Sequence, residues 1–336
     1  MKKNRIWWLL ILAAVLAIGG FGVWRFYRNQ VVNERHHVIA ILKSITRDND
    51  FWPELEKGIR AAGTQYNMTV EVRGPALESD VDRQNVIIEE SIARKPDIII
   101  LAPGDYNRSA EYVKKIRDAG ITLVLVDSDT AERLGVTLVA TDNVLAGKKV
   151  GMLLTDAIQK KREAGRANGV EKVAILSYVQ NSSTARDREK GVTAYLKEQE
   201  IPFIGPYYTQ SNARTAEDMT RQILHDHPDV TYLVGLNEWS AVGASRALVA
   251  LEKQDEIKVV GFDSSRTEAG FLEQEVLYGI VAQNPYSMGY LSVESAVKRI
   301  RGEAVLNMID SGSHAITKET MYDLENEKLL FPFQDQ

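Results

Sequence analysis

The sequence predicts an α/β protein with two similar doubly wound parallel-sheet lobes joined by a hinge, preceded by an N-terminal transmembrane helix. Short apolar runs, such as residues 38–42 and residues 98–101 of the expected strand 96–101, are typical of strands buried on both faces of a parallel sheet. They alternate with segments that have apolar residues at helical spacing, which favours right-handed βαβ units. The alternation occurs before and after residues 138–154, which we interpret as the first crossing between two lobes.

In the first half of the chain, the expected strands are residues 38–42, 70–72, 96–101, 121–126 and 138–140, and the expected helices are 51–66, 81–93 and 109–119. The last of these helices ends before Gly120, because glycine readily adopts the backbone conformation that follows a helix. At the crossing, an apolar run stops at Thr141. Asp142 or Asn143 can then cap the next helix by accepting hydrogen bonds from its first N–H groups.

In the second half, the expected strands are residues 173–176, 203–207, 232–235, 258–262 and 278–282, and the expected helices are 184–199, 213–225, 241–251, 267–274 and 286–301. Residues 316–324 are expected to form a short final pair of elements. The polar, charged segment 161–170 is expected to be a surface loop within one lobe.

The N-terminus predicts a membrane anchor at residues 1–28, followed by a polar tether at residues 29–36. Residues 6–24 contain no charge, and as a helix they are about 28 Å long, close to the hydrocarbon thickness of a bilayer. Tryptophans lie near both ends of this run, as interfacial aromatics do. A cleaved signal peptide is the alternative, but residues 22–28 are bulky and lack a small-x-small cleavage site. We therefore expect an uncleaved anchor, with the globular part outside the cytoplasm.

Composition excludes several classes of function. The 336-residue chain has a net charge of −5, which offers no general basic field for nucleic acid. Without cysteine, thiolate metal sites and cysteine catalysis are excluded. No phosphate-binding glycine loop, dinucleotide fingerprint or Gly-x-Ser-x-Gly occurs, so no cofactor or metal is expected. A helix-turn-helix, which DNA-binding proteins of related fold carry in front of their lobes, is replaced here by residues 6–24.

Polar residues follow nearly every expected strand. In open parallel sheets, ligands bind beyond the carboxyl ends of the strands. The polar side chains at these strand ends can both donate and accept hydrogen bonds, or can accept two hydrogen bonds at once. Binding of two adjacent hydroxyl groups requires such side chains. The main members of this polar set are Asp127, Arg186, Asn237, Asp263 and Gln283. Phe51, Trp52 and Trp239 lie at the same rim, where flat rings can stack on a sugar.

These residues lie in segments whose order and spacing resemble the type I periplasmic sugar-binding proteins, the ribose-binding group in particular. The segments are residues 49–52, 123–127, 140–144, 183–188, 236–238, 259–263 and 282–284. The resemblance covers about residues 36–331. It implies a hinged binder that closes on one monosaccharide, with crossings near Thr141, Gln283 and Gly312. Lobe 1 would then comprise residues 37–141 and 284–312, and lobe 2 residues 142–283 and 313–331.

The matching positions imply that Phe51 and Trp52 stack on the sugar ring. Asp127, Arg186, Asn237, Asp263 and Gln283 would bond its hydroxyls, and Asn49 and Asp105 complete the expected ligand-binding set. The chain departs from the ribose pattern in three places: Ser128 stands where ribose binders have arginine, Ala102 stands where they have asparagine, and an aromatic residue expected in the second lobe has no clear counterpart near residues 211–212. Because two hydrogen-bond donors are thereby lost, a pyranose, a polyol or a furanose signal molecule are alternatives to ribose.

The resulting hypothesis is a non-enzymatic, membrane-anchored, extracytoplasmic sugar-binding protein that delivers its ligand to an ABC permease. The first alternative is a sensor subunit that signals through a membrane histidine kinase. The second, from another class, is a glycosidase that uses Asp127 and Asp263 as a carboxylate pair. Ligand binding requires only the acceptor capacity of these two groups, so we favour binding over catalysis.

Overall fold

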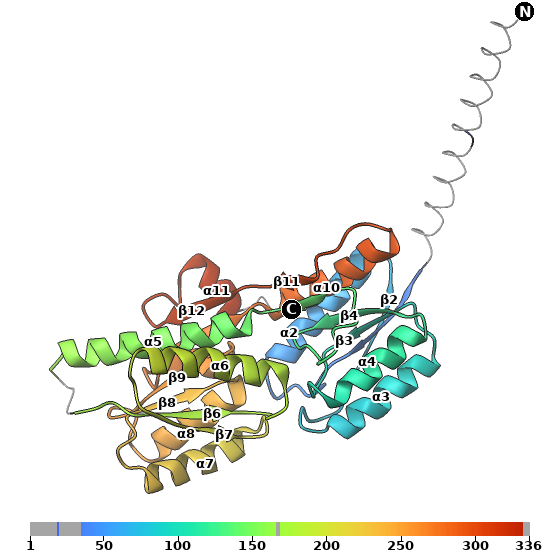
Figure 1. Cartoon of the computed structure of the whole chain (residues 1–336). Coiled ribbons are helices and arrows are strands. Elements are labelled where there is room, and N and C mark those ends of the chain that lie inside the picture. The colour runs from blue at the N-terminus through green and yellow to red at the C-terminus, as the bar shows by residue number, and fades with distance from the viewer. Residues whose placement is uncertain (1–18, 20–34, 166–168, 332–336) are drawn as a thin grey trace, which may run out of the picture.

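The computed structural model describes residues 19, 35–165 and 169–331, which form two α/β lobes lying side by side (Figure 1). Each lobe contains a six-stranded sheet with helices on both faces. The prediction of two α/β lobes with mainly parallel sheets is confirmed. The predicted membrane anchor lies outside the described residues except for Gly19, and no helix of the described part is long and apolar enough to cross a bilayer.

The first sheet has the strand order β11-β5-β4-β3-β1-β2, and every neighbouring pair in it is parallel. Its strands are β1 (His37–Ile41), β2 (Thr69–Arg73), β3 (Ile98–Leu101), β4 (Thr122–Val126), β5 (Leu138–Ala140) and β11 (Met308–Asp310). Helices α2 (Phe51–Gln65) and α10 (Pro285–Ile300) cover one face, and α3 (Val81–Ala93) and α4 (Arg108–Asp118) cover the other. Because both faces are covered, β1 and β3 are almost wholly buried, as their apolar sequences require.

The second sheet repeats this order as β12-β10-β9-β8-β6-β7. Its strands are β6 (Val173–Ser177), β7 (Phe203–Tyr208), β8 (Tyr232–Gly235), β9 (Lys258–Phe262), β10 (Leu277–Gln283) and β12 (Ser313–Thr317). Helices α5 (Asn143–Glu163) and α6 (Ser183–Glu198) pack on one face. The other face carries α7 (Ala213–Asp226), α8 (Glu238–Ala250), α9 (Arg266–Glu273) and α11 (Leu324–Leu330).

Three details differ from the sequence-based expectation. Strand β12 pairs antiparallel with β10, so the second sheet is not wholly parallel. Strand β11 was not predicted, because its three residues are largely exposed and its sequence has no buried apolar run. Helix α5 continues to Glu163 and takes in the start of the segment expected to be a loop.

The chain passes between the sheets three times: between β5 and α5, between β10 and α10, and between β11 and β12. Each crossing begins at the carboxyl end of a strand, where the lobes face each other. At the first crossing, the Asp142 side chain accepts a hydrogen bond of 2.9 Å from the Leu145 N–H and caps α5. Helix α10 then returns to the first lobe and packs against α2.

Candidate functional site

The carboxyl ends of strands from both sheets meet around one small cavity, which we call the inner cavity. Its volume is about 20 Å³, enough for one or two water molecules. It is lined by Lys43, Asn49, Phe51, Trp52, Glu78, Asp127, Tyr178, Thr184, Arg188, Asn237, Trp239, Asp263 and Gln283. Seven of the nine residues selected from the sequence for ligand binding are in this lining, contributed by both lobes.

Two aspartates occupy equivalent places in the two lobes. Asp127 directly follows β4 and Asp263 directly follows β9, and both have left-handed backbones, with φ of 62° and 80°. In each case the backbone N–H bonds to the neighbouring strand, to Val139 O and Val281 O respectively. Non-glycine residues in this conformation cost free energy and concentrate at functional sites. The geometry holds one carboxylate from each lobe at the wall of the same cavity.

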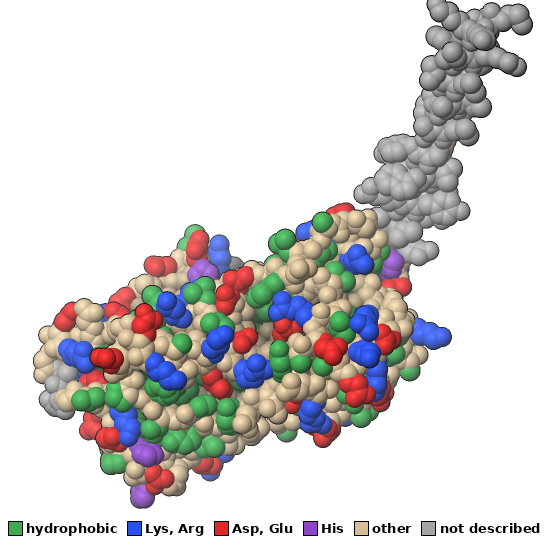
Figure 2. All heavy atoms as spheres, in the orientation of Figure 1, with side chains coloured by type: hydrophobic (Ala, Val, Ile, Leu, Met, Phe, Trp, Pro, Cys, Tyr) green, Lys and Arg blue, Asp and Glu red, His purple; other side chains and the backbone are tan. Residues whose placement is uncertain are grey.

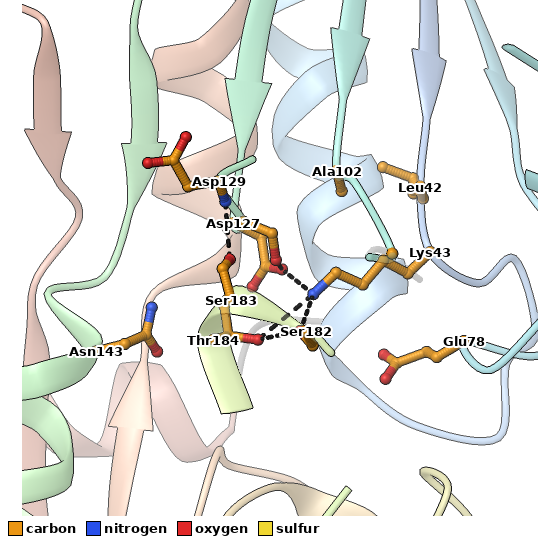
Figure 3. Close-up of polar contacts among 12 residues, drawn as sticks. Leu42, Lys43, Glu78, Ala102, Asp127, Asp129, Asn143, Ser182, Ser183 and Thr184 are labelled. Atoms are coloured by element: carbon orange, nitrogen blue, oxygen red, sulfur yellow. Dashed lines mark hydrogen bonds and ion pairs between the residues drawn. The ribbon is translucent and has the colours of Figure 1, made fainter. Parts of the chain in front are cut away.

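Lys43, the second residue after β1, lines the inner cavity and points its ammonium group towards Asp127, Ser182 and Thr184 (Figure 3). Its ammonium nitrogen lies 2.7 Å from Asp127 Oδ2 in the same lobe. It also donates to Ser182 Oγ at 3.2 Å and Thr184 Oγ1 at 3.4 Å, both on the second lobe. Because these bonds span the gap, Lys43 both neutralises Asp127 and joins the two lobes.

Glu78 makes a second polar connection between the lobes. Its carboxylate accepts hydrogen bonds from Trp52 Nε1 at 2.6 Å and from the Ser211 hydroxyl at 2.6 Å. Ser211 belongs to the second lobe. The Phe51 ring packs edge-on against Trp52, with centroids 4.8 Å apart, so these two aromatic rings form one wall of the inner cavity. Burial raises the pKa of Glu78, against the lowering effect of the Lys43 charge.

Arg188 is the arginine that reaches the inner cavity. Its Nε donates to Asn143 Oδ1 and its Nη1 to the Leu236 carbonyl, both at 2.8 Å. Its guanidinium carbon lies 3.7 Å from the centroid of the Phe262 ring. Helices α5 and α6 approach closely here: a Cβ on Gly147 would lie 2.2 Å from the Arg188 carbonyl oxygen. Close packing and fixed partners thus orient the guanidinium.

Asp263 is held by two donors from its own lobe. Gln283 Nε2 lies 2.5 Å from Asp263 Oδ1, and the Glu238 N–H donates to Oδ2 at 3.0 Å. Asn237 caps α8 by accepting from the Ser240 N–H at 3.0 Å, while its Nδ2 donates to Ser211 at 3.3 Å. Burial raises the pKa of Asp263, partly offset by the positive charge of Arg188.

Two acceptor atoms of the inner cavity have no partner within the described residues. These atoms, Asn49 Oδ1 and Gln283 Oε1, are buried and make no hydrogen bond. A buried acceptor without a partner costs about 1–3 kcal/mol, and native proteins rarely leave such groups unless a ligand or water uses them. We therefore expect these two oxygens to accept hydrogen bonds from hydroxyl groups, and a sugar carries several such groups.

A family model described as a periplasmic binding protein domain matches residues 41–304. The chain belongs to this family. The ribose import binding protein of Bacillus subtilis (strain 168) is 25% identical over 279 residues, covering 83% of this chain and 87% of that protein. The ribose import binding protein of Escherichia coli (strain K12) is 28% identical over 271 residues, covering 80% and 86% respectively.

Solved structures of family members resemble this periplasmic binding protein over most of its length. A solute-binding protein of an ABC transporter from Agrobacterium vitis, with bound D-fucose, is 32% identical with a TM-score of 0.81, covering 88% of this chain and 100% of that chain. A sugar transporter from Clostridium phytofermentans is 36% identical with a TM-score of 0.77, covering 84% and 99%. These relatives are described as binding or transport proteins, not enzymes. The recognition of the family from sequence motifs is confirmed.

Two of the predicted site residues of this periplasmic binding protein lie elsewhere. Arg186 is exposed and its guanidinium stacks on the Tyr106 ring, 4.1 Å from the centroid, outside the inner cavity. The reason is helical periodicity: Arg188, not Arg186, shares the buried face of α6 with Ala185 and Val192. Asp105 caps α4 instead, accepting from the N–H groups of Asn107 and Arg108 at 2.9 and 2.8 Å.

Five lining residues were not among the ligand-binding residues chosen from the sequence: Lys43, Glu78, Tyr178, Thr184 and Arg188. Thr184 and Arg188 do lie in the segment 183–188 that carries the family resemblance. Three of the five carried a usable signal. Lys43 follows the apolar run of β1 closely, and Arg188 and Thr184 lie on the apolar face of α6. Glu78 lies in the loop between β2 and α3, where no local pattern distinguishes it from a solvated surface carboxylate.

A cluster of carboxylates lies behind Asp263. Burial, followed by the nearby charge of Asp263, raises the pKa of Glu238 to about 8. Burial also raises the pKa of Glu268 well above its usual range, and the charge of Glu238 adds to this effect. Glu238 Oε2 accepts from the Asp50 N–H of the first lobe at 3.2 Å. Among the described residues, no grouping of histidine and carboxylate side chains could hold a metal ion.

Proposed function

We propose that this protein is the sugar-binding component of an ABC-type sugar import system, with the ligand enclosed between its two lobes. The observation that carries the proposal is the pair of unpartnered buried acceptors, Asn49 Oδ1 and Gln283 Oε1, in an aromatic-walled cavity between the lobes. Arg188 and Asp263 lie in the same lining, so the cavity offers both donors and acceptors. Relatives that bind ribose or D-fucose support a sugar as the ligand.

In this proposal, binding is coupled to closure about a hinge at the three crossings. Lobe 1 would comprise residues 37–141 and 284–312, and lobe 2 residues 142–283 and 313–331. The contacts of Lys43 and Glu78 with Ser182, Thr184 and Ser211 can form only when the lobes are together. The inner cavity, about 20 Å³ in volume, must widen to admit a sugar. A sugar that bonds groups of both lobes then shifts the population towards the closed form.

The uncharged segment at residues 6–24 supports membrane anchoring, with the lobes outside the cytoplasm. The same segment favours the second candidate, a sensor subunit of a membrane histidine kinase, because an uncleaved helix can transmit closure to a partner helix. Purification of the full-length protein from membranes distinguishes the two candidates. Copurification of a permease supports import, and copurification of a kinase supports sensing.

Thermal denaturation over a panel of monosaccharides tests the binding proposal, since a ligand that binds only the folded state raises the melting temperature. We expect at least one aldose to stabilise the protein, and Asp263→Ala to abolish that stabilisation. Asp255→Ala, at an exposed position outside the inner cavity, is the matched control. The proposal fails if Asp263→Ala folds and responds to the sugar as the parent protein does.

A further inference from the structure

The gap between the lobes contains a second, much larger cavity, which we call the outer chamber. Its volume is about 380 Å³, against about 20 Å³ for the inner cavity. Glu78 and Trp239 line both spaces, so the two adjoin. Residues of the first lobe (Thr46, Asp48, Ala76) and of the second lobe (Asn212, Arg246, Thr267) complete its walls. A volume of this size lies within the range of small-molecule sites, about 300–1,000 Å³.

The lobes touch around the inner cavity, and Lys43 lies in its lining. The Lys43 bonds to Ser182 and Thr184 and the Glu78 bond to Ser211 are all made in this closed arrangement. The outer chamber nevertheless remains open beside these contacts. Contact between the lobes therefore does not remove this space. A ligand that fills both the inner cavity and the outer chamber must be larger than one that fills the inner cavity alone.

The outer chamber carries polar groups of both signs. Asp48 of the first lobe and Arg246 of the second line it, and both side chains are exposed. Thr46, Thr267 and Asn212 add hydroxyl and amide groups, and Trp239 contributes an aromatic ring at the boundary with the inner cavity. Such a mixture of donors, acceptors and a flat ring suits a second sugar unit.

We propose that the outer chamber is a second sugar subsite, and that the ligand is a disaccharide or another glycoside spanning both spaces. This inference rests on the proposed sugar-binding function. One unit lies against Asp263 and Arg188, in the inner cavity widened from its present volume of about 20 Å³, and the second lies in the outer chamber between Asp48 and Arg246. Trp239 packs on the ligand where the two units join.

Calorimetric titration of the purified full-length protein with matched saccharides tests the proposal. The probes are D-ribose, D-galactose and D-glucose, together with lactose, melibiose, maltose, cellobiose and methyl glycosides of each monosaccharide. We expect at least one disaccharide or glycoside to bind about tenfold tighter than its parent monosaccharide, a difference of about 1.4 kcal/mol. Binding by monosaccharides alone, with their disaccharides and glycosides binding no tighter, overturns the second subsite and leaves the proposed function intact.

Two variants locate the binding of the larger ligand. Ala76→Trp places a large side chain in the outer chamber from an exposed loop position, and Ala250→Trp is the matched control at the exposed end of α8. Ala76→Trp should weaken the larger ligand at least tenfold while monosaccharide affinity changes less than twofold. Equal effects of both variants, or none from Ala76→Trp, overturn the subsite. If no saccharide of either size binds the parent protein, the proposed function itself fails.

Discussion

The Lys43 ammonium nitrogen lies 2.7 Å from Asp127 Oδ2, and both side chains are about 95% buried, with 4% and 5% exposure. The pair therefore sits in the inner cavity out of contact with bulk water (Figure 3). A buried charge without its partner is strongly destabilising, because desolvation is then uncompensated. The same ammonium also contacts Ser182 and Thr184 of the other lobe, so this ion pair is part of the interface between the lobes.

Lys43→Met should destabilise the ligand-free protein by about 3 kcal/mol, because Asp127 loses its buried counter-ion. The double variant Lys43→Met/Asp127→Asn should recover much of that loss, since no uncompensated charge remains. Urea unfolding at neutral pH measures both changes in the free energy of unfolding. If Asp127→Asn lowers the free energy of unfolding by the same amount in Lys43→Met as in the parent protein, the two residues are not coupled.

Arg188→Met and Arg186→Met are a matched pair of variants that tests which of the two arginines binds the sugar. Arg188→Met should abolish sugar-induced stabilisation and cost about 2–3 kcal/mol of stability, because Asn143 Oδ1 and the Leu236 carbonyl lose their donor. Arg186→Met should change stability by less than about 0.5 kcal/mol, as exposed positions usually do. Thermal denaturation with and without sugar compares them. A larger effect on sugar binding from Arg186→Met would contradict our placement of the site.

Stability should fall as the pH rises from about 5 to about 8 because of Glu238. Its pKa is raised from 4.5 to about 8 in the folded protein, so in this interval the folded state binds a proton that the unfolded state has lost. The slope is therefore negative, at most about 1.4 kcal/mol per pH unit for one proton. Urea unfolding across this range should show a shallower slope for Glu238→Gln. Glu252→Gln, at an exposed position, should keep the parent slope.

Ser211→Ala should favour the open arrangement of the lobes. It removes the hydroxyl that donates to Glu78 across the gap, and a hydrogen bond to a charged group contributes about 1.5–3 kcal/mol. Small-angle X-ray scattering of the ligand-free variant should give a larger radius of gyration than that of the parent protein. Ser79→Ala, which alters an exposed serine beside Glu78, should leave the radius unchanged. An unchanged radius in Ser211→Ala would show that this bond does not hold the lobes together.

The two-lobe architecture was predictable because the strands of a doubly covered parallel sheet must be apolar throughout. Residues 38–42 and 98–101 show this directly, and the strands they form, β1 and β3, are almost wholly buried. Strand β11, in contrast, was not predictable from its own sequence. It is three residues long and largely exposed, so its pairing with β5 depends on where the crossings bring it, and no local pattern marks it.

The sequence by itself determined that polar side chains follow the strands, and it identified Asp127, Asn237, Asp263 and Gln283 at strand ends. Only the tertiary structure decided which of the neighbouring side chains enter the cavity. Arg188 faces inward and Arg186 outward because of the rotation of α6 against α5. Lys43 and Glu78 join the site because their partners lie about 140 residues away in the chain, in the other lobe. Such contacts depend on how the two lobes meet, and the residues that determine this are distributed over both sheets.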